Sequence, residues 1–408
     1  MSFRLAYIVS HPIQYQAPLL RHLSRAGGID LQVFFLSDFS LRRHYERPFN
    51  QTFKWDVSLI DGYKSEILPR PFVAASATPR PWWPVGGLRH RLREGRFDAV
   101  WIHGWGHLGL NQAVNDATAL GIPVLLRGES APEASSDLGI QKRLRKTVFL
   151  QWLFRRVAGF LCIGSRNYDF YRQWGVSEDR LFAVPYAVDN DFFQAGAADA
   201  RPRREKLRNA PSLEPGRPII LFAGKFIHTK GPDELLKAFT QIYSHAHGSD
   251  SPYLLFVGDG PLRKRMEEQA APMGEAVRFL GFRNQTELPA LYDLCDVVVV
   301  PSRFEPWGLV VNEVMNAARP IIVSDRVGAA PDLVVNGGNG FVYQSGDVAT
   351  LAGRLQQILL SPALRVAMGE QSLRRINNWD FAADHRGLLH ALSSACRKHT
   401  TAEGEIAG

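Results

Sequence analysis

Two glutamates in the second half of the chain, Glu305 and Glu313, stand eight positions apart in a setting that suits ligand chemistry. Glu305 lies in a loop shaped by proline and glycine, and Glu313 lies about one turn inside the helix predicted next. The N–H groups of Gly308, Leu309 and Val310 open that helix, and N–H groups in that position bind anions. A carboxylate placed like Glu313 can accept both hydroxyls of a ribose. The stretch predicts a nucleotide site; the alternative makes Glu305 a helix-dipole partner and Glu313 a surface residue.

A glycine-rich loop earlier in this half is a candidate for holding phosphates. Lys225 and Lys230 lie between Gly224 and Gly231, after an apolar strand and before a helix with proline in its first turn. Glycines let the backbone approach a ligand closely, and two ammonium groups can converge on one diphosphate. A second turn, at Gly258, ends another apolar strand. A solvated turn is the alternative for the 224–231 loop, whose spacing excludes a P-loop because Lys230 precedes glycine rather than serine or threonine.

These stretches together resemble glycosyltransferase family 4. The two glutamates form that family's E-x7-E signature, and the loop around Glu305 is very like the family's loop. The segment 224–231 resembles its diphosphate loop, although Lys225 stands where many members have arginine. The resemblance covers about residues 182–395 well and residues 1–181 loosely. Segments that match in order and spacing also include 257–261, 280–282 and 324–332.

The resemblance implies an α/β protein of the GT-B type, with two Rossmann-like doubly wound domains facing a central cleft and a C-terminal helix that crosses back to the first domain. It implies a retaining transferase that needs no metal or other cofactor and binds a nucleotide diphosphate sugar with its second domain. Lys225 and Lys230 would hold the diphosphate, Glu313 the ribose and Glu305 the donor sugar. The donor-binding residues implied are Gly224, Lys225, Lys230, Gly258, Gly281, Phe282, Arg283, Glu305, Trp307, Gly308, Leu309, Val310 and Glu313, with Gly281–Arg283 beside the base.

Candidate acceptor residues lie at strand ends in the first half. The loop after the first predicted strand carries His11, Gln14 and Tyr15, and the next candidate segment carries His103 and His107. A loop in this position faces the predicted cleft, so we expect acceptor contacts there. The alternatives are a polar turn for the first group and a structural role for the two histidines.

One departure from the family pattern concerns proton transfer. Arg127 ends a predicted strand where many family members carry a histidine that lines the reaction centre. A guanidinium cannot act as a base. We therefore expect Arg127 to hold a donor phosphate or an acidic acceptor, with Glu129 as the better base candidate. The catalytic candidates are Glu305, Lys230, Lys225, Arg127 and Glu129.

The elements that would position these residues alternate between short apolar runs and amphipathic stretches, which is typical of parallel sheets covered on both faces. Residues 40–98 are less regular and contain Pro69, Pro71, Pro79, Pro81 and Pro84. Predicted strands are 5–10, 31–36, 99–103, 123–127, 160–164, 182–185, 218–223, 253–257, 277–280, 297–300 and 321–323. Predicted helices are 17–26, 108–120, 232–243, 287–294 and 309–318, with 266–270 inside another and further helices from Val348 onward.

The pattern divides the chain into an acceptor domain at 1–187, a donor domain at 188–374 and a returning helix at 375–395. Ala, Arg, Pro and Gly dominate residues 195–218, which favours a mobile surface connection. Asp189 and Asp191 resemble a metal-binding pair, but we interpret them as turn and helix-cap residues.

The composition of the 408 residues fits a globular enzyme: 45% are hydrophobic and 22% charged. Three distant cysteines and a short apolar start indicate a reduced, cytoplasmic protein without an export signal. The chain has 48 basic and 40 acidic residues, and this excess of positive charge favours anionic partners. No nucleic-acid recognition motif appears. Residues 141–156 hold six basic and no acidic residues, which suits peripheral contact with anionic lipid on the inner face of the membrane. A core helix with a solvated basic side is the alternative.

We therefore expect a hexosyltransferase-type glycosyltransferase that moves a sugar from a nucleotide diphosphate sugar to a glycan, lipid-linked or small-molecule acceptor, in polysaccharide or glycoconjugate biosynthesis. The rival interpretations are a GT-B sugar-nucleotide epimerase or phosphorylase, and a non-catalytic nucleotide-binding scaffold. The four residues Lys225, Lys230, Glu305 and Glu313 argue against the scaffold, whereas Arg127 leaves it open.

Overall fold

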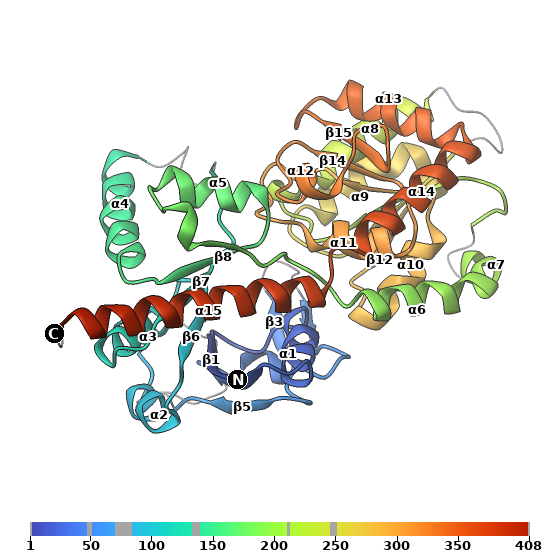
Figure 1. Ribbon diagram of the computed structural model, residues 1–408. Coiled ribbons are helices and arrows are strands. Elements are labelled where there is room, and N and C mark those ends of the chain that lie inside the picture. Colours follow the sequence, from blue (N-terminus) through green and yellow to red (C-terminus); the bar gives the residue numbers. More distant parts are fainter. Residues whose placement is uncertain are drawn as a thin grey trace. The chain divides into compact units, whose positions relative to one another are not determined.

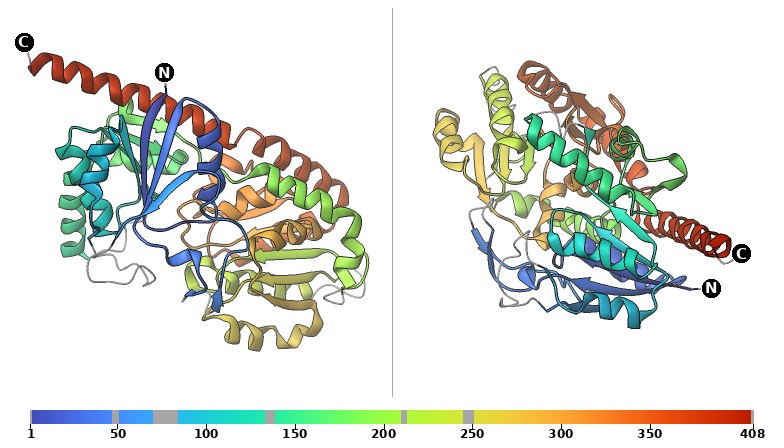
Figure 2. Two further views of the ribbon diagram at one scale, coloured as in Figure 1. Left: turned by 90° about the horizontal axis from the view of Figure 1, so that it is seen from below. Right: turned by 90° about the vertical axis from the view of Figure 1, so that its left-hand side faces the viewer.

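The computed structural model describes residues 2–46, 51–69, 84–132, 139–209, 213–244 and 251–406. The chain divides into two compact units. Unit 1 consists of Met1–His44, Ser58–Tyr186 and Phe381–Gly408, and unit 2 consists of Tyr45–Val57 and Ala187–Asp380. Each unit contains one large parallel sheet flanked by helices (Figures 1 and 2).

Unit 1 is built on a seven-stranded sheet with the strand order β5-β2-β1-β6-β7-β8-β9. Neighbouring strands are parallel; Leu5 of the first strand, for example, pairs with Leu31 on one side and Ala99 on the other. Central strands of such a sheet are buried on both faces, which explains the continuous apolar sequences of β1 and β6, whereas the edge strand β5 is polar and largely exposed. The strands are β1 (Phe3–Val9), β2 (Ile29–Phe35), β5 (Lys64–Ile67), β6 (Ala99–His103), β7 (Val124–Arg127), β8 (Gly159–Cys162) and β9 (Leu181–Ala183).

Helices cover both faces of this sheet. On one face, Leu20 of α1 and Leu392 of α15 belong to the same buried cluster as Tyr7 of β1. On the other face, the helices α2 to α5 pack over Ile8, the next residue of the same strand. Successive strand residues point to opposite faces, so both faces are apolar. The helices are α1 (Gln16–Arg25), α2 (Leu88–Gly95), α3 (Leu108–Ala119), α4 (Ile140–Phe154), α5 (Ser165–Gln173) and α15 (Phe381–Ile406).

Unit 2 contains a six-stranded parallel sheet with the order β12-β11-β10-β13-β14-β15. The strands are β10 (Ile219–Ala223), β11 (Tyr253–Val257), β12 (Val277–Gly281), β13 (Val297–Val300), β14 (Ile321–Ser324) and β15 (Gly340–Tyr343). The helices are α6 (Asn190–Ala200), α7 (Arg204–Asn209), α8 (Pro232–Tyr243), α9 (Arg263–Ala270), α10 (Leu288–Leu294), α11 (Leu309–Asn316), α12 (Ala330–Leu333), α13 (Val348–Leu359) and α14 (Pro362–Ile376). Two doubly wound parallel sheets confirm the predicted α/β class.

The C-terminal helix returns to unit 1, as predicted, but begins at Phe381 rather than at 375. A separate helix, α14, ends at Ile376, where the N–H of Trp379 donates to the Ile376 carbonyl. Helix α15 then packs so closely on strand β9 that a Cβ on Gly387 would lie 1.9 Å from the Ala183 carbonyl oxygen. A glycine at this helix position therefore permits the docking of α15 on the sheet.

Two regions differ from the sequence prediction. The expected mobile connection at 195–218 contains the end of α6 and all of α7 within its described part, because the alanines and arginines there form helix readily. The irregular region 40–98 contains the short strands β3 (His44–Glu46) and β4 (Gln51–Phe53), the edge strand β5 and helix α2. Pro71, Pro79 and Pro81 lie outside the described residues.

Candidate functional site

The predicted donor residues of unit 2 gather at the carboxyl ends of its strands. The strand order reverses between β10 and β13, since β11 and β12 extend one way and β14 and β15 the other. Ligands of doubly wound sheets bind beyond the carboxyl ends at such a reversal. Lys225 and Lys230 follow β10, and Glu305 follows β13, so the reversal brings the predicted phosphate and sugar residues together.

Glycines allow the loops at this edge to pack backbone against backbone. A Cβ on Gly258, which has a φ of +129°, would lie 1.9 Å from the Gly224 carbonyl oxygen. The N–H of Gly258 donates to the Gly281 carbonyl at 2.9 Å. On the other side, a Cβ on Gly231 would lie 2.1 Å from the carbonyl oxygen of Pro301. The loops after β10, β11, β12 and β13 therefore form one connected surface.

Both lysines predicted to hold a diphosphate contact carboxylates. The Nζ of Lys230 forms an ion pair with Oε2 of Glu305, whose side chain is 11% exposed. The Nζ of Lys225 lies 2.9 Å from Oε1 of Glu46, a residue that also belongs to unit 2. Lys230 and Glu305 therefore lie in direct contact at the strand reversal, and Lys225 has a carboxylate partner that the sequence did not indicate.

Glu313 lies inside helix α11, where the hydroxyl of Tyr292 donates to its Oε2 at 2.6 Å. Burial raises the pKa of Glu313 to about 7, although the Tyr292 hydrogen bond favours the ionised form. The carboxyl group is therefore poised between its two protonation states near neutral pH. This is the environment that a ligand-binding carboxyl group needs if its charge is to respond to pH.

Helix α11 begins at a constrained turn. Gly308 has a φ of +98°, and a Cβ there would lie 3.1 Å from both Glu305 Cγ and Val327 Cγ1. The first N–H groups of the helix, at Leu309 and Val310, have no intrahelical acceptors by geometry. Trp307 is only 3% exposed, donates from Nε1 to Asn312 at 2.9 Å and stacks on Trp379. Trp307 therefore shapes the loop from inside, which does not fit the direct donor contact expected of it.

The predicted base loop, Gly281–Arg283, follows β12. Phe282 stacks on Phe53 with ring centroids 4.3 Å apart, and Arg283 pairs with Glu287 at 3.0 Å. The loop is thus packed against the segment 51–57 of unit 2, a contact that no sequence pattern predicted.

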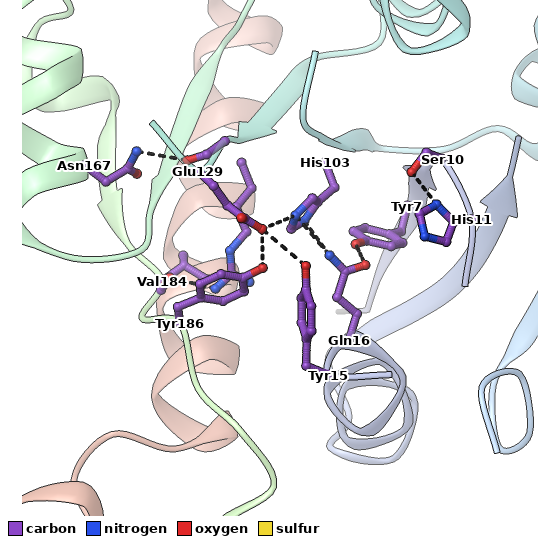
Figure 3. A network of polar contacts seen from close by, with 12 residues as sticks. Tyr7, Ser10, His11, Tyr15, Gln16, His103, Glu129, Asn167, Val184 and Tyr186 are labelled. Atoms are coloured by element: carbon purple, nitrogen blue, oxygen red, sulfur yellow. Dashed lines mark hydrogen bonds and ion pairs between the residues drawn. The ribbon is translucent and has the colours of Figure 1, made fainter. Parts of the chain in front are cut away.

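In unit 1, the candidate acceptor residues also gather at a strand reversal, between β1 and β6 (Figure 3). The Tyr7 hydroxyl donates to Gln16 Oε1 at 2.6 Å, and Gln16 Nε2 lies 2.9 Å from His103 Nε2. His103 Nε2 in turn lies 3.5 Å from Glu129 Oε1. A chain of polar contacts therefore links β1, α1, the end of β6 and the loop after β7.

Two tyrosine hydroxyls also approach the carboxylate of Glu129. The hydroxyl of Tyr186 donates to its Oε1, and the hydroxyl of Tyr15 approaches the same oxygen at 3.4 Å. Burial opposes ionisation of Glu129, but the contacts from His103 and Tyr186 outweigh it, so its pKa lies below the ordinary value. Burial lowers the pKa of His103 more than Glu129 raises it. The pair is therefore an ionised carboxylate beside a neutral imidazole, and Glu129 remains 37% exposed.

Arg127 occupies a different environment from the one expected. Its side chain is 1% exposed, and its Nη1 lies 3.2 Å from the Asp384 carboxylate on α15. Its Nη2 donates to the Val184 and Pro185 carbonyls at 3.2 and 3.0 Å, and its guanidinium lies over the ring of Tyr186. Burial and these contacts do not fit the expected role of Arg127 in holding a phosphate or an acidic acceptor. The geometry makes it a residue that ties β7, α15 and the 184–186 segment together.

Three further candidates lie in loops of unit 1. His11 has its Nδ1 2.9 Å from the Ser10 hydroxyl and packs edge-on to Phe39. Gln14 is partly buried in the loop before α1, and His107 is the N-cap of α3. In unit 2, Asp189 caps α6 by accepting from the Phe192 N–H at 3.0 Å, as the sequence predicted.

The chain matches two family models. Residues 203–375 match the model described as glycosyl transferases group 1, and residues 13–187 match the glycosyl transferase 4-like domain. The chain belongs to the glycosyltransferases that these two models describe, and both matches are consistent with glycosyltransferase family 4. The two matches together include all the predicted donor, acceptor and catalytic residues except His11.

Curated relatives of this glycosyltransferase include two from Streptomyces kanamyceticus. The 2-deoxystreptamine glucosyltransferase is 33% identical over 61% of this chain and 62% of the relative. The alpha-D-kanosaminyltransferase is 28% identical over 53% of this chain and 55% of the relative. A D-inositol 3-phosphate glycosyltransferase from Nocardia farcinica is 29% identical over 76% of this chain and 69% of the relative. The match to the two Streptomyces enzymes thus spans little more than half of their length.

Solved structures of the same fold match almost the whole chain. A sucrose-phosphate synthase from Thermosynechococcus elongatus has a TM-score of 0.69 and 19% identity, with 99% of each chain covered. The Anabaena protein Alr3699/HepE, in complex with UDP and glucose, has a TM-score of 0.72 and 16% identity, with 96% of this chain and 100% of that chain covered. These likenesses establish the GT-B fold for the glycosyltransferase.

Sequence reasoning missed several residues of the two sites in this glycosyltransferase. Gln16 and Tyr186 belong to the unit 1 network, and Tyr292 contacts Glu313 in unit 2. Gln16 follows Tyr15 directly, so its position at the start of α1 was a usable signal. Tyr292 and Tyr186 lie far in sequence from their partners, and no local pattern marks them.

Among the described residues, no helix is both long enough and apolar enough to cross a membrane.

Proposed function

We propose that this family member transfers a sugar from a nucleotide diphosphate sugar to a hydroxyl acceptor with retention of the anomeric configuration. The observation that carries the proposal is the contact of Lys230 with Glu305 at the strand reversal of unit 2, beside the N-terminus of α11. One residue of that pair can neutralise the leaving diphosphate, and the other can accept hydroxyls of the sugar. Since the Anabaena neighbour was solved in complex with UDP and glucose, UDP is the first nucleotide to test.

The donor site must stabilise two charges as the sugar–phosphate bond breaks: negative charge on the diphosphate and oxocarbenium-like positive charge on the sugar. We assign the first task to Lys225, Lys230 and the N–H groups that open α11, which would supply the positive charge without a metal ion. Glu305 would bind the sugar, and Glu313 the ribose hydroxyls. When donor enters, the diphosphate would replace the carboxylates as the partner of both lysines.

Retention on this site would proceed by attack on the face that the phosphate leaves. The acceptor oxygen forms a bond to the anomeric carbon, the bond from that carbon to the phosphate oxygen breaks, and the acceptor proton passes to the departing phosphate oxygen. The lysines then hold a nucleoside diphosphate as the second product. The scheme needs no covalent sugar–enzyme intermediate, so Glu305 acts by position and charge.

The acceptor would bind in unit 1 at Glu129. The carboxylate already accepts hydroxyl donors from Tyr186 and Tyr15, and its exposed fraction leaves room for a third. The neutral imidazole of His103 beside it can accept a proton or a hydrogen bond. We propose a polyhydroxylated acceptor, either a small molecule or the sugar of a lipid-linked glycan, in glycoconjugate or polysaccharide assembly.

We further propose that helix α4 places the protein on the cytoplasmic face of a membrane. Ile140, Leu144 and Val148 are spaced four residues apart, so they lie along one side of the helix, and they are 88%, 64% and 60% exposed. Figure 1 shows α4 at the margin of unit 1. The exposed basic residues Lys142 and Arg145 lie on the same helix. An exposed apolar row beside basic residues suits the surface of an anionic bilayer, while Leu150, Leu153 and Phe154 of the same helix pack in the core of unit 1.

Thermal unfolding in the presence of ligands tests the donor assignment. A nucleotide at about 100 times its dissociation constant stabilises its target by about 2.7 kcal/mol. We expect UDP, ADP or GDP to raise the melting temperature of the wild type but not of Lys230→Ala. Lys237→Ala removes an exposed lysine from α8 and should respond like the wild type. If no nucleotide acts on the wild type, the donor site is wrong and the scaffold alternative is favoured.

Product analysis separates transfer from epimerisation. The thermal unfolding test identifies the nucleotide that stabilises the protein. The common sugar conjugates of that nucleotide are then incubated with and without a cyclitol or glycan acceptor, and the release of nucleoside diphosphate is followed. A transferase gives a glycoside with the donor's anomeric configuration, whereas an epimerase gives an altered sugar without acceptor.

Sedimentation with vesicles of phosphatidylglycerol or phosphatidylcholine tests the membrane contact of α4. Leu144→Asp should abolish binding to the anionic vesicles, because it places a negative charge in the exposed apolar row. Val366→Asp, at an equally exposed position on α14, should not change binding. Binding of Leu144→Asp equal to wild type would contradict the membrane contact.

A further inference from the structure

The segment 51–57 belongs to the compact unit that carries the donor loops, although more than a hundred residues of unit 1 separate it from them in sequence. Its aromatic side chains pack on the loop that follows β12. Phe53 is 6% exposed and stacks on Phe282 at 4.3 Å with an interplanar angle of 27°, and Trp55 packs edge-on to Phe53 at 5.0 Å. The ring of Phe282 therefore has a fixed partner from outside its own part of the chain.

Hydrogen bonds hold the same loop two residues further on. Asn284 Nδ2 donates to the carbonyl oxygen of Lys54 at 2.8 Å. The hydroxyl of Thr286 donates to Asp56 Oδ2, and the Thr286 N–H approaches the same oxygen at 3.3 Å. An aromatic stack together with hydrogen bonds at two nearby residues fixes both the position and the orientation of the 282–286 loop.

A second contact of this part of the chain falls on the diphosphate loop. Glu46 pairs with Lys225, and both side chains are about two-thirds or more buried, with 26% and 31% exposed. The stretch 46–56 thus makes one contact with the loop assigned to the base and another with the loop assigned to the diphosphate. Both loops therefore have partners from the same short stretch in the first half of the chain.

We propose that Phe53 and Asp56 are positioning residues that set base selectivity by holding the 282–286 loop, and that Glu46 competes with the donor diphosphate for Lys225. The proposal deepens the proposed function, because it rests on the assignment of these loops to a nucleotide donor. Its physical basis is rigidity: a base-reading loop that is held in place discriminates between bases, whereas a loop free to shift accommodates several.

The two parts of the proposal predict different binding patterns. Phe53→Leu and Asp56→Ala should narrow the ratio of dissociation constants among UDP, ADP and GDP by about three- to tenfold. The same variants should leave the affinity for inorganic pyrophosphate unchanged, because pyrophosphate has no base. Glu46→Gln should tighten pyrophosphate and all three nucleotides by the same factor, about two- to fivefold, because Lys225 loses its competitor.

Calorimetric titration of the full chain measures these constants, with Thr52→Ala as the control, since Thr52 is an exposed neighbour in β4. If Phe53→Leu and Asp56→Ala narrow the ratio of dissociation constants among UDP, ADP and GDP and leave the affinity for pyrophosphate unchanged, the positioning role is supported. Equal losses for every ligand, pyrophosphate included, would indicate a general effect on folding and overturn it. Weaker binding by Glu46→Gln would overturn the competition. If the wild type binds none of the nucleotides, the proposed function itself fails. If the wild type binds them but Phe53→Leu and Asp56→Ala discriminate between the bases as strongly as the wild type does, only the positioning role is refuted.

Discussion

Arg127 and Asp384 form an ion pair at 3.2 Å in which both side chains are 2% exposed or less. The first residue ends strand β7, and the second lies in the first turn of the C-terminal helix α15. The guanidinium also donates to two carbonyls of the segment that leads out of unit 1. The pair therefore joins the C-terminal helix to the sheet at the edge where the network around Glu129 lies.

Removing one member of this pair should destabilise the protein strongly. Asp384→Ala leaves the Arg127 charge buried without its carboxylate, and losses of this kind cost about 3–5 kcal/mol. The free energy of unfolding in urea measures the effect. Glu178→Gln breaks the exposed pair of Glu178 with Arg172, and we expect a change below about 1 kcal/mol. A similar small loss for Asp384→Ala would contradict the structural role of Arg127.

Donor affinity should increase as the pH rises through about 7. The raised pKa of Glu313 leaves it mostly neutral at pH 6 and mostly ionised at pH 8, and only the carboxylate accepts two ribose hydroxyls. We expect the dissociation constant of a UDP-sugar, whose diphosphate does not titrate in this range, to fall about tenfold between these pH values. Titration calorimetry at several pH values measures this change.

Two variants distinguish Glu313 from other titrating groups. Glu313→Gln should bind the UDP-sugar more weakly and without the pH dependence. Tyr292→Phe removes the hydrogen bond that favours the carboxylate, so the transition should move to higher pH. An unchanged profile in both variants would assign the titration elsewhere. The same shift affects stability: a carboxyl group with a raised pKa favours the folded state below its unfolded value, and this contribution is lost as the pH rises from about 4.5 to about 7.

Substitutions of Lys230 and Glu305 should have different effects on UDP affinity and on the rate of the chemical step. Lys230→Ala should weaken binding of UDP itself, because the nucleoside diphosphate loses a charge partner. Glu305→Gln should retain UDP binding but lower kcat by about two to three powers of ten, because its assigned contacts are to the sugar. Steady-state kinetics and UDP calorimetry report the two effects. Equal loss of UDP affinity in Glu305→Gln would show that its main role is to hold Lys230.

The contact between the β10 and β11 loops should tolerate no side chain. Gly258→Ala places a methyl group within 1.9 Å of the Gly224 carbonyl oxygen at a φ that alanine rarely adopts, so we expect lost donor binding and a lower melting temperature. Gly353→Ala is the matched control, since a Cβ in the middle of α13 meets nothing within 4 Å. Alanine favours helix, so that variant should gain about 1 kcal/mol. Equal effects of the two substitutions would contradict the close loop packing.

The local pattern was sufficient for most of the regular structure. Ala99–His103, Tyr253–Val257, Val297–Val300 and Pro232–Tyr243 have the predicted bounds, because buried parallel strands are continuous apolar runs and the helix starts at a proline. β15 and α15 were harder: Gly340–Tyr343 follows a run of asparagine and glycine that reads as a turn, and α15 starts just after Trp379, which stacks on the distant Trp307. Packing between distant residues leaves no local signature.

By itself, the sequence determined the α/β class, the order of strands and helices, the family and the loops that carry Lys230, Glu305 and Glu313. These follow from periodicity, glycine and proline placement and motif spacing, all of which act over a few residues. Only the tertiary structure decided that Arg127 is buried against Asp384, that Tyr292 contacts Glu313 and that Phe53 stacks on Phe282. Each of these pairs is brought together by chain folding, so neither local periodicity nor motif spacing marks it.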